Sequence, residues 1–459
     1  MIESTEFDVV VLGGGSGGYA TALRAAELDL SVALIEKDKL GGTCLHRGCI
    51  PTKALLHAGE VADAAREAEQ FGVNATFNGI DMKSVNAYKD GVVSRLYKGL
   101  QGLVKSRKIT YIEGTGKLVA PTTVEVDGSR YTGRNLVLAT GSYAKTLPGL
   151  DIDGERVITS DHALTLDHVP ASVVVIGGGV IGCEFASAWR SFGAEVTIIE
   201  ALPRLLAVED EQSSKMLERA FRRRGIAFKV NKPFEGIART ETGVRVTVSG
   251  GESVEAELAL VAVSRGPSTA DLGYEEQGIK LDRGFVPTDD RLRTSVPNVY
   301  AVGDIVPGMQ LAHRGFQQGI FVAEEIAGLN PPVIDEAGIP RVTYCEPEVA
   351  SMGLNEAKAR EQYDDKITTF TYDLAGNGKS QILKTQGFVK LVRVADGPVV
   401  GIHMVGSRVS ELIGEAQLIY NWEAFPADVA QLVHMHPTQT EALGEAHLAL
   451  AGKPLHVHG

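Results

Sequence analysis

The residues with the clearest chemical potential are two cysteines, Cys44 and Cys49, in the segment LGGTCLHRGCIPTK. In a regular helix, residues five apart have Cα atoms roughly 8 to 9 Å apart, beyond the roughly 7 Å that a disulfide can bridge. If the two sulfurs bond, the helix must be distorted between them, and Gly48 and Pro51 are the residues that would permit it. Only four cysteines occur in 459 residues, so the close pair indicates a metal-binding or redox-active site. A metal centre is disfavoured because no second tight Cys/His pair lies at zinc-finger spacing.

A glycine-rich turn follows the first apolar run of the chain. Residues 7–12 (FDVVVL) lead into GGGSGG at 13–18, and a helical stretch at 19–28 and a second apolar run at 31–35 come next. This order is typical of a dinucleotide-binding unit, in which the glycines allow a tight turn, admit the pyrophosphate and let the helix pack on the strand. The positive end of the helix then faces the phosphates. The predicted contacts are Gly13, Gly15, Ser16 and Gly18, with Glu36 at the ribose hydroxyls.

The same pattern returns in the middle of the chain. An apolar run at 172–176 precedes GGGVIG at 177–182, and a second strand at 195–199 ends before Glu200. An acid at that position favours the free 2′-hydroxyl of NAD and repels the 2′-phosphate of NADP. Arg204 lies nearby and weakens this preference. The predicted NAD contacts are Gly177, Gly179, Val180, Ile181, Gly182 and Glu200.

The elements that must position these residues indicate an α/β chain with two Rossmann-like domains. Between the two units we expect a long helical region over about 52–107 and β-rich segments over 110–147. A linker is expected near 148–154, where proline, glycine and acidic residues gather. Beyond about residue 340, β-rich and helical stretches alternate, and this part is expected to form a separate α+β domain.

Charge and hydropathy exclude several classes of protein. The net charge of −13 argues against binding nucleic acid or an anionic membrane through net charge. The basic run Arg222–Arg224 is expected to be a solvated helix end. No apolar stretch approaches the roughly 18 residues of a membrane helix, and the first six residues are acidic where a signal peptide would be basic. We therefore expect a cytoplasmic protein with no nucleic-acid or membrane partner and no metal.

Together these motifs resemble those of the FAD-dependent pyridine nucleotide-disulfide oxidoreductases, the family of glutathione, mycothione and mercuric reductases. The likeness covers nearly the whole chain. Besides both glycine fingerprints and the cysteine segment, it rests on ATGS at 139–142, PNVYAVGD at 297–304 and HMHPTQTE at 434–441.

The resemblance implies a redox disulfide between Cys44 and Cys49, with FAD at the first fingerprint and NAD at the second. It also implies that His436 is the acid/base residue and that Glu441 orients and charges its ring. Lys53 is expected near the flavin, paired with Glu184. The remaining contacts that the resemblance implies are Lys37, Gly42, Thr43, Lys53, Gly116, Ala139, Thr140, Gly141, Asp304 and Ala312 for FAD, and Ser264 for NAD.

The family fold also implies an assembly. It delivers the histidine to the disulfide of the other subunit, so we expect an obligate homodimer formed through the C-terminal domain. The expected boundaries are 1–147 for the FAD domain, 148–269 for the NAD domain, 270–338 for a segment completing the FAD domain, and 339–459 for the interface domain.

The range of candidate substrates is narrowed by features that particular family members have and this chain lacks. No vicinal cysteine pair occurs at the C-terminus, which disfavours mercuric reductase and the large thioredoxin reductases. Glu200 and Ala201 disfavour glutathione reductase, which prefers NADP. The resemblance implies oxidation of dihydrolipoamide, and mycothione or another small disulfide stays open as the alternative. A structural role as the flavoprotein subunit of a 2-oxo acid dehydrogenase complex, with lipoyl domains as partners, is a third possibility.

The chain departs from the family at two places. His46 and Arg47 stand where Asn-Val is usual, a change expected to affect substrate entry or the thiolate. Ser264 replaces a common glycine at the end of the last strand of the NAD domain. The isolated Cys183 and Cys345 are predicted to be small buried residues.

Overall fold

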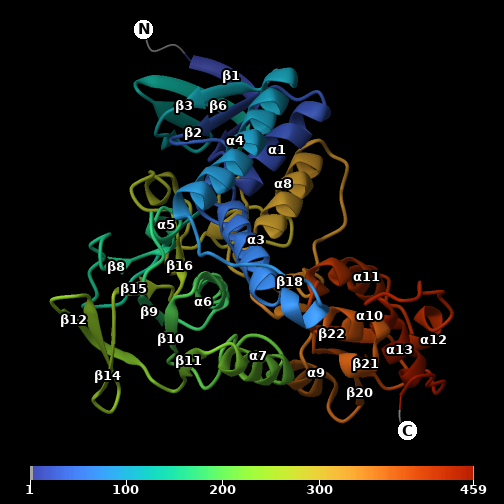
Figure 1. Ribbon diagram of the computed structural model, residues 1–459. Coiled ribbons are helices and arrows are strands. Elements are labelled where there is room, and N and C mark those ends of the chain that lie inside the picture. Colours follow the sequence, from blue (N-terminus) through green and yellow to red (C-terminus); the bar gives the residue numbers. More distant parts are fainter. Residues whose placement is uncertain (1–3, 458–459) are drawn as a thin grey trace.

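The computed structural model describes residues 4–457 and shows three regions (Figure 1). The N-terminal sheet lies at the top of the view, the middle of the chain at lower left and the C-terminal part at lower right. In the described part of the chain, no helix has the length and apolar character needed to cross a bilayer.

The first region is built on a mostly parallel sheet in the order β3-β2-β1-β6-β5-β4, with β17 paired to β6. Its central strands are continuous apolar runs, as expected for parallel strands covered on both faces, and Val9, Val10 and Val11 are fully buried. Helices α1 (Ser16–Glu27) and α8 (Ala312–Ile326) pack together beside it. The strands are β1 (Ser4–Leu12), β2 (Val32–Glu36), β3 (Thr110–Glu113), β4 (Lys117–Ala120), β5 (Thr123–Val126), β6 (Ser129–Leu138) and β17 (Val299–Ala301).

The helical region expected over 52–107 is interrupted. Helix α3 (Cys49–Arg66) is followed by the short 3₁₀ turn η1 (Ala68–Phe71), and α4 (Met82–Ser106) begins only after a stretch without helix. Gly72 takes a left-handed conformation with φ +76°, which ends the first part. Asp81 then caps α4 by accepting from the amides of residues 83 and 84.

The second region repeats the βαβ pattern. Its parallel sheet has the order β11-β10-β9-β15-β8 and carries α6 (Val180–Phe192) and α7 (Glu211–Arg223). A three-stranded antiparallel sheet, β12-β13-β14, adjoins it. The strands are β8 (Val157–Ile158), β9 (Ser172–Ile176), β10 (Glu195–Ile199), β11 (Ile226–Lys229), β12 (Phe234–Arg239), β13 (Val244–Val248), β14 (Glu252–Ala256) and β15 (Leu258–Val261).

One expectation for this region was wrong in part. Arg224, the last residue of the basic run, is only 19% exposed, and its guanidinium donates to Ser187 Oγ and Ser191 Oγ at 2.7 Å each. It also contacts Asp63 Oδ2 on α3 at 3.2 Å. The residue therefore ties the second region to the first, a role that a charge run alone does not reveal.

Two short antiparallel strands, β7 (Ser142–Ala144) and β16 (Arg265–Pro267), carry the chain from the first region to the second and back. The third region is an antiparallel sheet in the order β18-β19-β22-β21-β20, with α11 (Val409–Asn421) and α13 (Glu441–Leu450) packed on it. Its other elements are α9 (Glu356–Tyr363), α10 (Gly378–Leu383) and α12 (Pro426–Val429), and its strands are β18 (Arg341–Thr343), β19 (Glu348–Gly353), β20 (Ile367–Asp373), β21 (Phe388–Val394) and β22 (Val399–Gly406).

Candidate active site

The two cysteines lie on either side of a helix break. Helix α2 (Gly42–Arg47) carries Cys44, and α3 begins at Cys49. Gly48 stands between the helices with φ −143° and ψ −114°, and a Cβ there would lie 3.0 Å from the Thr43 carbonyl oxygen. The expected distortion between the cysteines is therefore present, and it depends on a residue without a side chain.

The pKa values of the two thiols are shifted in opposite directions. Both cysteines are free thiols in this structure. The hydrogen bond from Cys44 lowers the pKa of Cys49 to about 7, against the opposing effect of burial and with help from the charge of Lys53. The same hydrogen bond, together with burial, raises the pKa of Cys44. Cys49 is thus the thiolate of the pair near neutral pH, and Cys44 is the thiol.

Lys53 lies one helical turn after Cys49 and pairs with Glu184 on α6. Its Nζ is 2.9 Å from each carboxylate oxygen of Glu184, which is almost fully buried. Burial is the largest single effect and lowers the pKa of Lys53, but the charge and the hydrogen bond of Glu184 and the charges of Cys49 and Tyr344 together outweigh it. The net shift is upward, so the lysine stays cationic. Tyr344, which follows β18, was not identified from the sequence: its ring centroid lies 4.6 Å from Lys53 Nζ and its amide donates to Glu184 at 3.0 Å.

His436 and Glu441 lie together in the third region, where Glu441 is the first residue of α13. Nδ1 of the histidine is 2.9 Å from Glu441 Oε1, and the amide of Thr438 donates to Oε2 at 2.7 Å. The imidazole is 78% exposed. Its neighbour α13 packs against α12, β20 and β21, whereas α2 packs against α3 and α4. The structure therefore does not bring this pair to the cysteines within one chain.

The first glycine fingerprint forms a backbone cradle. Gly13 has φ +107°, and a Cβ there would lie 2.2 Å from the Ala139 carbonyl oxygen. A Cβ on Gly18 would lie 1.8 Å from the Gly13 oxygen, so the helix can pack this closely only on glycine. Gly42, at the start of α2, approaches Gly15 so closely that its Cβ would be 2.7 Å from the Gly15 Cα. Such a cradle, at the N-terminus of α1, fits the pyrophosphate of a dinucleotide.

A cavity of about 390 Å³ opens beside this cradle at the carboxyl ends of the strands. Glu36 crosses its rim, where one oxygen accepts from the Gly14 amide at 2.6 Å and the other from the Asp38 amide at 2.9 Å. A carboxylate held this way is placed to receive ribose hydroxyls. The expected contacts that line the cavity are Gly13, Glu36, Lys37, Gly116 and Thr140, and they are joined by Tyr143, Lys145 and Arg283.

Asp304 is held by residues from β7 and β16, the two strands that connect the first and second regions. Ser142 donates its hydroxyl to Asp304 Oδ2 at 2.5 Å, and Arg265 donates from Nε to the same hydroxyl oxygen at 2.8 Å. Neither Ser142, the last residue of the ATGS segment, nor Arg265 was identified as a site residue from the sequence. Ala312, also expected as a contact, begins α8, and Gly141 has φ +73° between Thr140 and Ser142.

The second fingerprint has the same local geometry. Gly177 has φ +113°, and a Cβ on Gly182 would lie 1.9 Å from the Gly177 oxygen. Glu200 accepts from the Gly178 amide at 2.6 Å. Arg204 donates to the carbonyl oxygens of Ala207 and Glu209 instead of facing Glu200.

The remaining expected contacts of this site are exposed to different degrees. Gly179 is the N-cap of α6, and Val180 and Ile181 are its first residues, where the amides have no partner within the helix. Ser264 is exposed, and its hydroxyl turns to the Arg265 carbonyl oxygen at 3.3 Å.

The unusual residues between the cysteines point away from the sulfurs. His46 Nε2 is 2.8 Å from the Leu40 carbonyl oxygen, and its ring meets Tyr97 edge-on with centroids 5.0 Å apart. Arg47 pairs with Asp38 at 3.1 Å. Cys183 and Cys345, predicted to be small buried residues, are buried.

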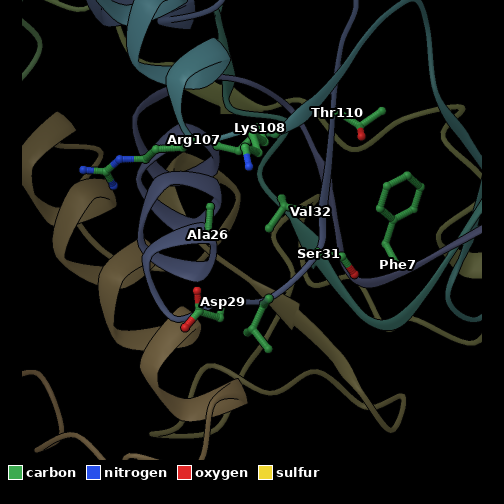
Figure 2. A pocket seen from close by; sticks show the side chains of 10 residues that line it. Phe7, Ala26, Asp29, Ser31, Val32, Arg107, Lys108 and Thr110 are labelled. Atoms are coloured by element: carbon green, nitrogen blue, oxygen red, sulfur yellow. The ribbon is translucent and has the colours of Figure 1, made fainter.

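A separate hollow of about 260 Å³ lies at the opposite edge of the first sheet (Figure 2). It is lined where β2 and β3 begin, by residues such as Val32 and Thr110, with Arg107 and Lys108 nearby. Dinucleotides bind outside the carboxyl ends of such strands, so this hollow is not part of the cofactor sites.

Comparisons with known proteins show which family the chain resembles. Residues 7–319 match the family model described as pyridine nucleotide-disulphide oxidoreductase, and residues 339–447 match the dimerisation domain of the same family. The chain is 39% identical to a dihydrolipoyl dehydrogenase of Bacillus subtilis, over 99% of this chain and 100% of the relative. It is 38% identical to that of Geobacillus stearothermophilus, over 98% of each chain.

Solved structures show the same fold. LpdA from Mycobacterium tuberculosis superposes with a TM-score of 0.90 at 27% identity, over 97% of this chain and 99% of the other. The HOCl-induced flavoprotein disulfide reductase RclA from Escherichia coli, solved as a Cu(II) complex, has a TM-score of 0.87 at 26% identity, over 97% of this chain and 100% of the other.

Proposed function

The chain belongs to the pyridine nucleotide-disulphide oxidoreductases, and we propose that within this family it is a dihydrolipoyl dehydrogenase that oxidises dihydrolipoamide and reduces NAD. The observation that carries the proposal is the polarised pair of Cys44 and Cys49 beside the Lys53–Glu184 ion pair. Relatives that share nearly the full length of the chain and bear the dihydrolipoyl dehydrogenase name support the choice of substrate.

The protein's own residues account for the thiol chemistry. His436 accepts a proton from one substrate thiol, and the resulting thiolate attacks Cys44 of the oxidised Cys44–Cys49 disulfide. The S–S bond breaks and Cys49 leaves as a thiolate, its stable form here. The sulfur of the second substrate thiol then attacks the substrate sulfur of the mixed disulfide, and oxidised lipoamide departs. Cys44 leaves and takes the proton that His436 held, and His436 accepts the proton of the second thiol, so that one substrate proton ends on Cys44 and the other on His436. The substrate has lost two electrons and two protons, and the reduced chain holds Cys44 as thiol and Cys49 as thiolate.

The family uses FAD and NAD, and the two cradles fit these groups. When bound, FAD accepts the electron pair from the dithiol and delivers it as a hydride to NAD. The proposed FAD residues are Gly13, Gly15, Ser16, Gly18, Glu36, Lys37, Gly42, Thr43, Lys53, Gly116, Ala139, Thr140, Gly141, Asp304 and Ala312. The proposed NAD residues are Gly177, Gly179, Val180, Ile181, Gly182, Glu200 and Ser264.

The match to the dimerisation domain supports a homodimer. We propose that His436 serves the cysteine pair of the partner subunit, because within one chain their elements do not pack on each other. Lipoyl domains of a 2-oxo acid dehydrogenase complex are the proposed macromolecular partners, and a reducing cytoplasm is the proposed location, since it suits a chain with few cysteines. The proposed domains keep the boundaries 1–147, 148–269, 270–338 and 339–459.

Steady-state kinetics test the proposal directly. Dihydrolipoamide with NAD should give a high kcat/KM, while mycothione with NADPH should give little turnover. The reverse ranking would replace dihydrolipoamide by mycothione. The Cys49→Ser and Cys44→Ser variants should both lose dithiol oxidation, and a variant that kept it would contradict the assignment of the redox pair.

A further inference from the structure

A second histidine–glutamate pair lies beside His436. His434 Nε2 is 2.8 Å from Glu415 Oε1 on α11. The other oxygen of Glu415 accepts from the Thr440 hydroxyl at 2.6 Å. Glu415 therefore holds the loop at two points, one on each side of His436. Nothing in the proposed thiol chemistry uses this pair.

The ring of His434 is wedged against α13. A Cβ on Gly444 would lie 2.5 Å from His434 Nδ1 and 2.9 Å from Cε1, so the ring rests on a helix position that only glycine leaves free. Glycine inside a helix costs roughly 0.5–1 kcal/mol relative to alanine, and here it makes room for the imidazole. The side chain of His434 is only 13% exposed, in contrast to the open ring of His436.

Several ionisable side chains surround the His434 ring and affect one another's pKa. The hydrogen bond to Glu415 raises the pKa of His434 in spite of its burial, so the ring is favoured as a cation. Burial raises the pKa of Glu441, but the Thr438 amide, His436 and the charge of His434 lower it by more, so the net shift is downward. The other titratable group here is His447 on α13, whose pKa burial lowers to about 4, so it remains neutral. Glu441 thus contacts the His436 ring directly and is also affected by the charge of the His434 ring.

We propose that His434 is a positioning residue for His436: with Glu415 it fixes the loop that carries the base, and its charge competes with His436 for Glu441. The proposal rests on the role assigned to His436 in dithiol oxidation. The cationic ring opposes a second positive charge at the same carboxylate.

Two variants separate the two effects. In His434→Gln the amide can still donate to Glu415, but the charge is gone, so the acid limb of kcat/KM for dihydrolipoamide should move to higher pH. His434→Ala removes both the tie and the charge, and kcat should fall by about 10- to 100-fold, as expected when a supported catalytic group is misplaced. NADH-driven ferricyanide reduction, which needs no dithiol, should be unchanged in both variants.

The same helix offers a matched control. His456 makes a similar pair with Glu445, with Nδ1 2.7 Å from Oε1, near the other end of α13. His456→Gln should leave the pH profile unchanged. Thr440→Ala, which removes one tie without touching a ring, should lower kcat without moving the acid limb.

The outcomes distinguish this inference from the proposed function. An active wild type together with a His434→Gln variant of unaltered pH profile overturns the charge competition. A His434→Ala variant with wild-type kcat overturns the loop support. A wild type that does not oxidise dihydrolipoamide overturns the proposed function and removes the basis of the inference with it.

Discussion

The two glycine fingerprints have nearly the same local geometry but different surroundings. In each, the first glycine has a φ close to +110°. A Cβ added to the last glycine would lie within 2 Å of the carbonyl oxygen of the first. In each, the acid after the second strand accepts from a glycine amide at 2.6 Å. The local motif therefore does not distinguish the two sites.

The difference lies in what closes over the turn. At the first site Gly17 lies so close to Val302 that a Cβ would be 2.8 Å from its side chain, and Gly42 covers Gly15. At the second, a Cβ on Gly179 would meet nothing within 4 Å, and Val180 is 37% exposed. A covered cradle suits a cofactor that stays bound, and an open one suits a cofactor that must leave after each turnover. This comparison supports FAD at the first site and NAD at the second.

The largest test replaces the last glycine of each fingerprint. Gly18→Val and Gly182→Val both place a side chain against a backbone oxygen, so each should lower cofactor affinity at its own site by at least about 100-fold. Gly18→Val should purify without flavin. Gly182→Val should stay yellow but lose NAD reduction. Flavin absorbance per chain and NADH titration measure the two losses, and a colourless Gly182→Val protein would contradict the independence of the sites.

A smaller effect is expected from loosening the cover of the first site. Gly42→Ala adds a Cβ 2.7 Å from Gly15 at a position with φ +57°, so FAD should dissociate about 10- to 100-fold faster. NAD affinity should not change. Gly99→Ala on α4, where nothing lies within 4 Å, is the matched control and should be neutral or stabilising. Equal FAD release from both variants would show that the cover does not retain the flavin.

The acids should differ in which cofactor they affect. Glu200→Gln should raise the KM for NAD by about 10-fold and shrink the preference over NADP, because a charge-assisted hydrogen bond to ribose is worth about 1.5–3 kcal/mol. Glu36→Gln should change FAD retention less than Glu200→Gln changes the KM for NAD, since the covered cradle supplies most of the contacts to FAD. Kinetics with NAD and NADP check the first claim and flavin release the second. A wild type that uses both nucleotides equally would remove the case for Glu200.

The smallest effect concerns the thiol pair between the sites. The pKa of Cys49 is lowered to about 7, so its thiolate forms as pH rises through 7, and alkylation of the reduced chain by iodoacetamide should rise over that range and level off above it. Cys44→Ser weakens the hydrogen bond that is the largest cause of the shift. The midpoint of the alkylation profile should then move upward, toward an ordinary thiol. A midpoint that stays at 7 would assign the shift to Lys53 instead.

Features set by neighbours in the chain could be predicted from the sequence. The break at Gly48 depends on a clash with Thr43, which is close in the chain, so residue type and spacing suffice. The clash that requires a glycine at Gly13 is with the distant Ala139, so the sequence predicts that turn only through the fingerprint. The helix over 52–107 was the exception, because helical composition continues through the turn at Gly72. The pairing of Lys53 with Glu184 and the place of His436 came from the family resemblance, and periodicity alone would not have given them.

The sequence by itself determined the two dinucleotide folds and predicted the redox pair and the acid at each ribose position, because each needs only a short run of residues. The tertiary structure decided which site is covered and which side chains support the chemistry. Tyr344 reaches Lys53, Arg265 reaches Ser142 and His434 reaches Glu415 only through the packing of separate elements. Such contacts depend on how whole elements pack, and no local pattern in a single chain records that packing.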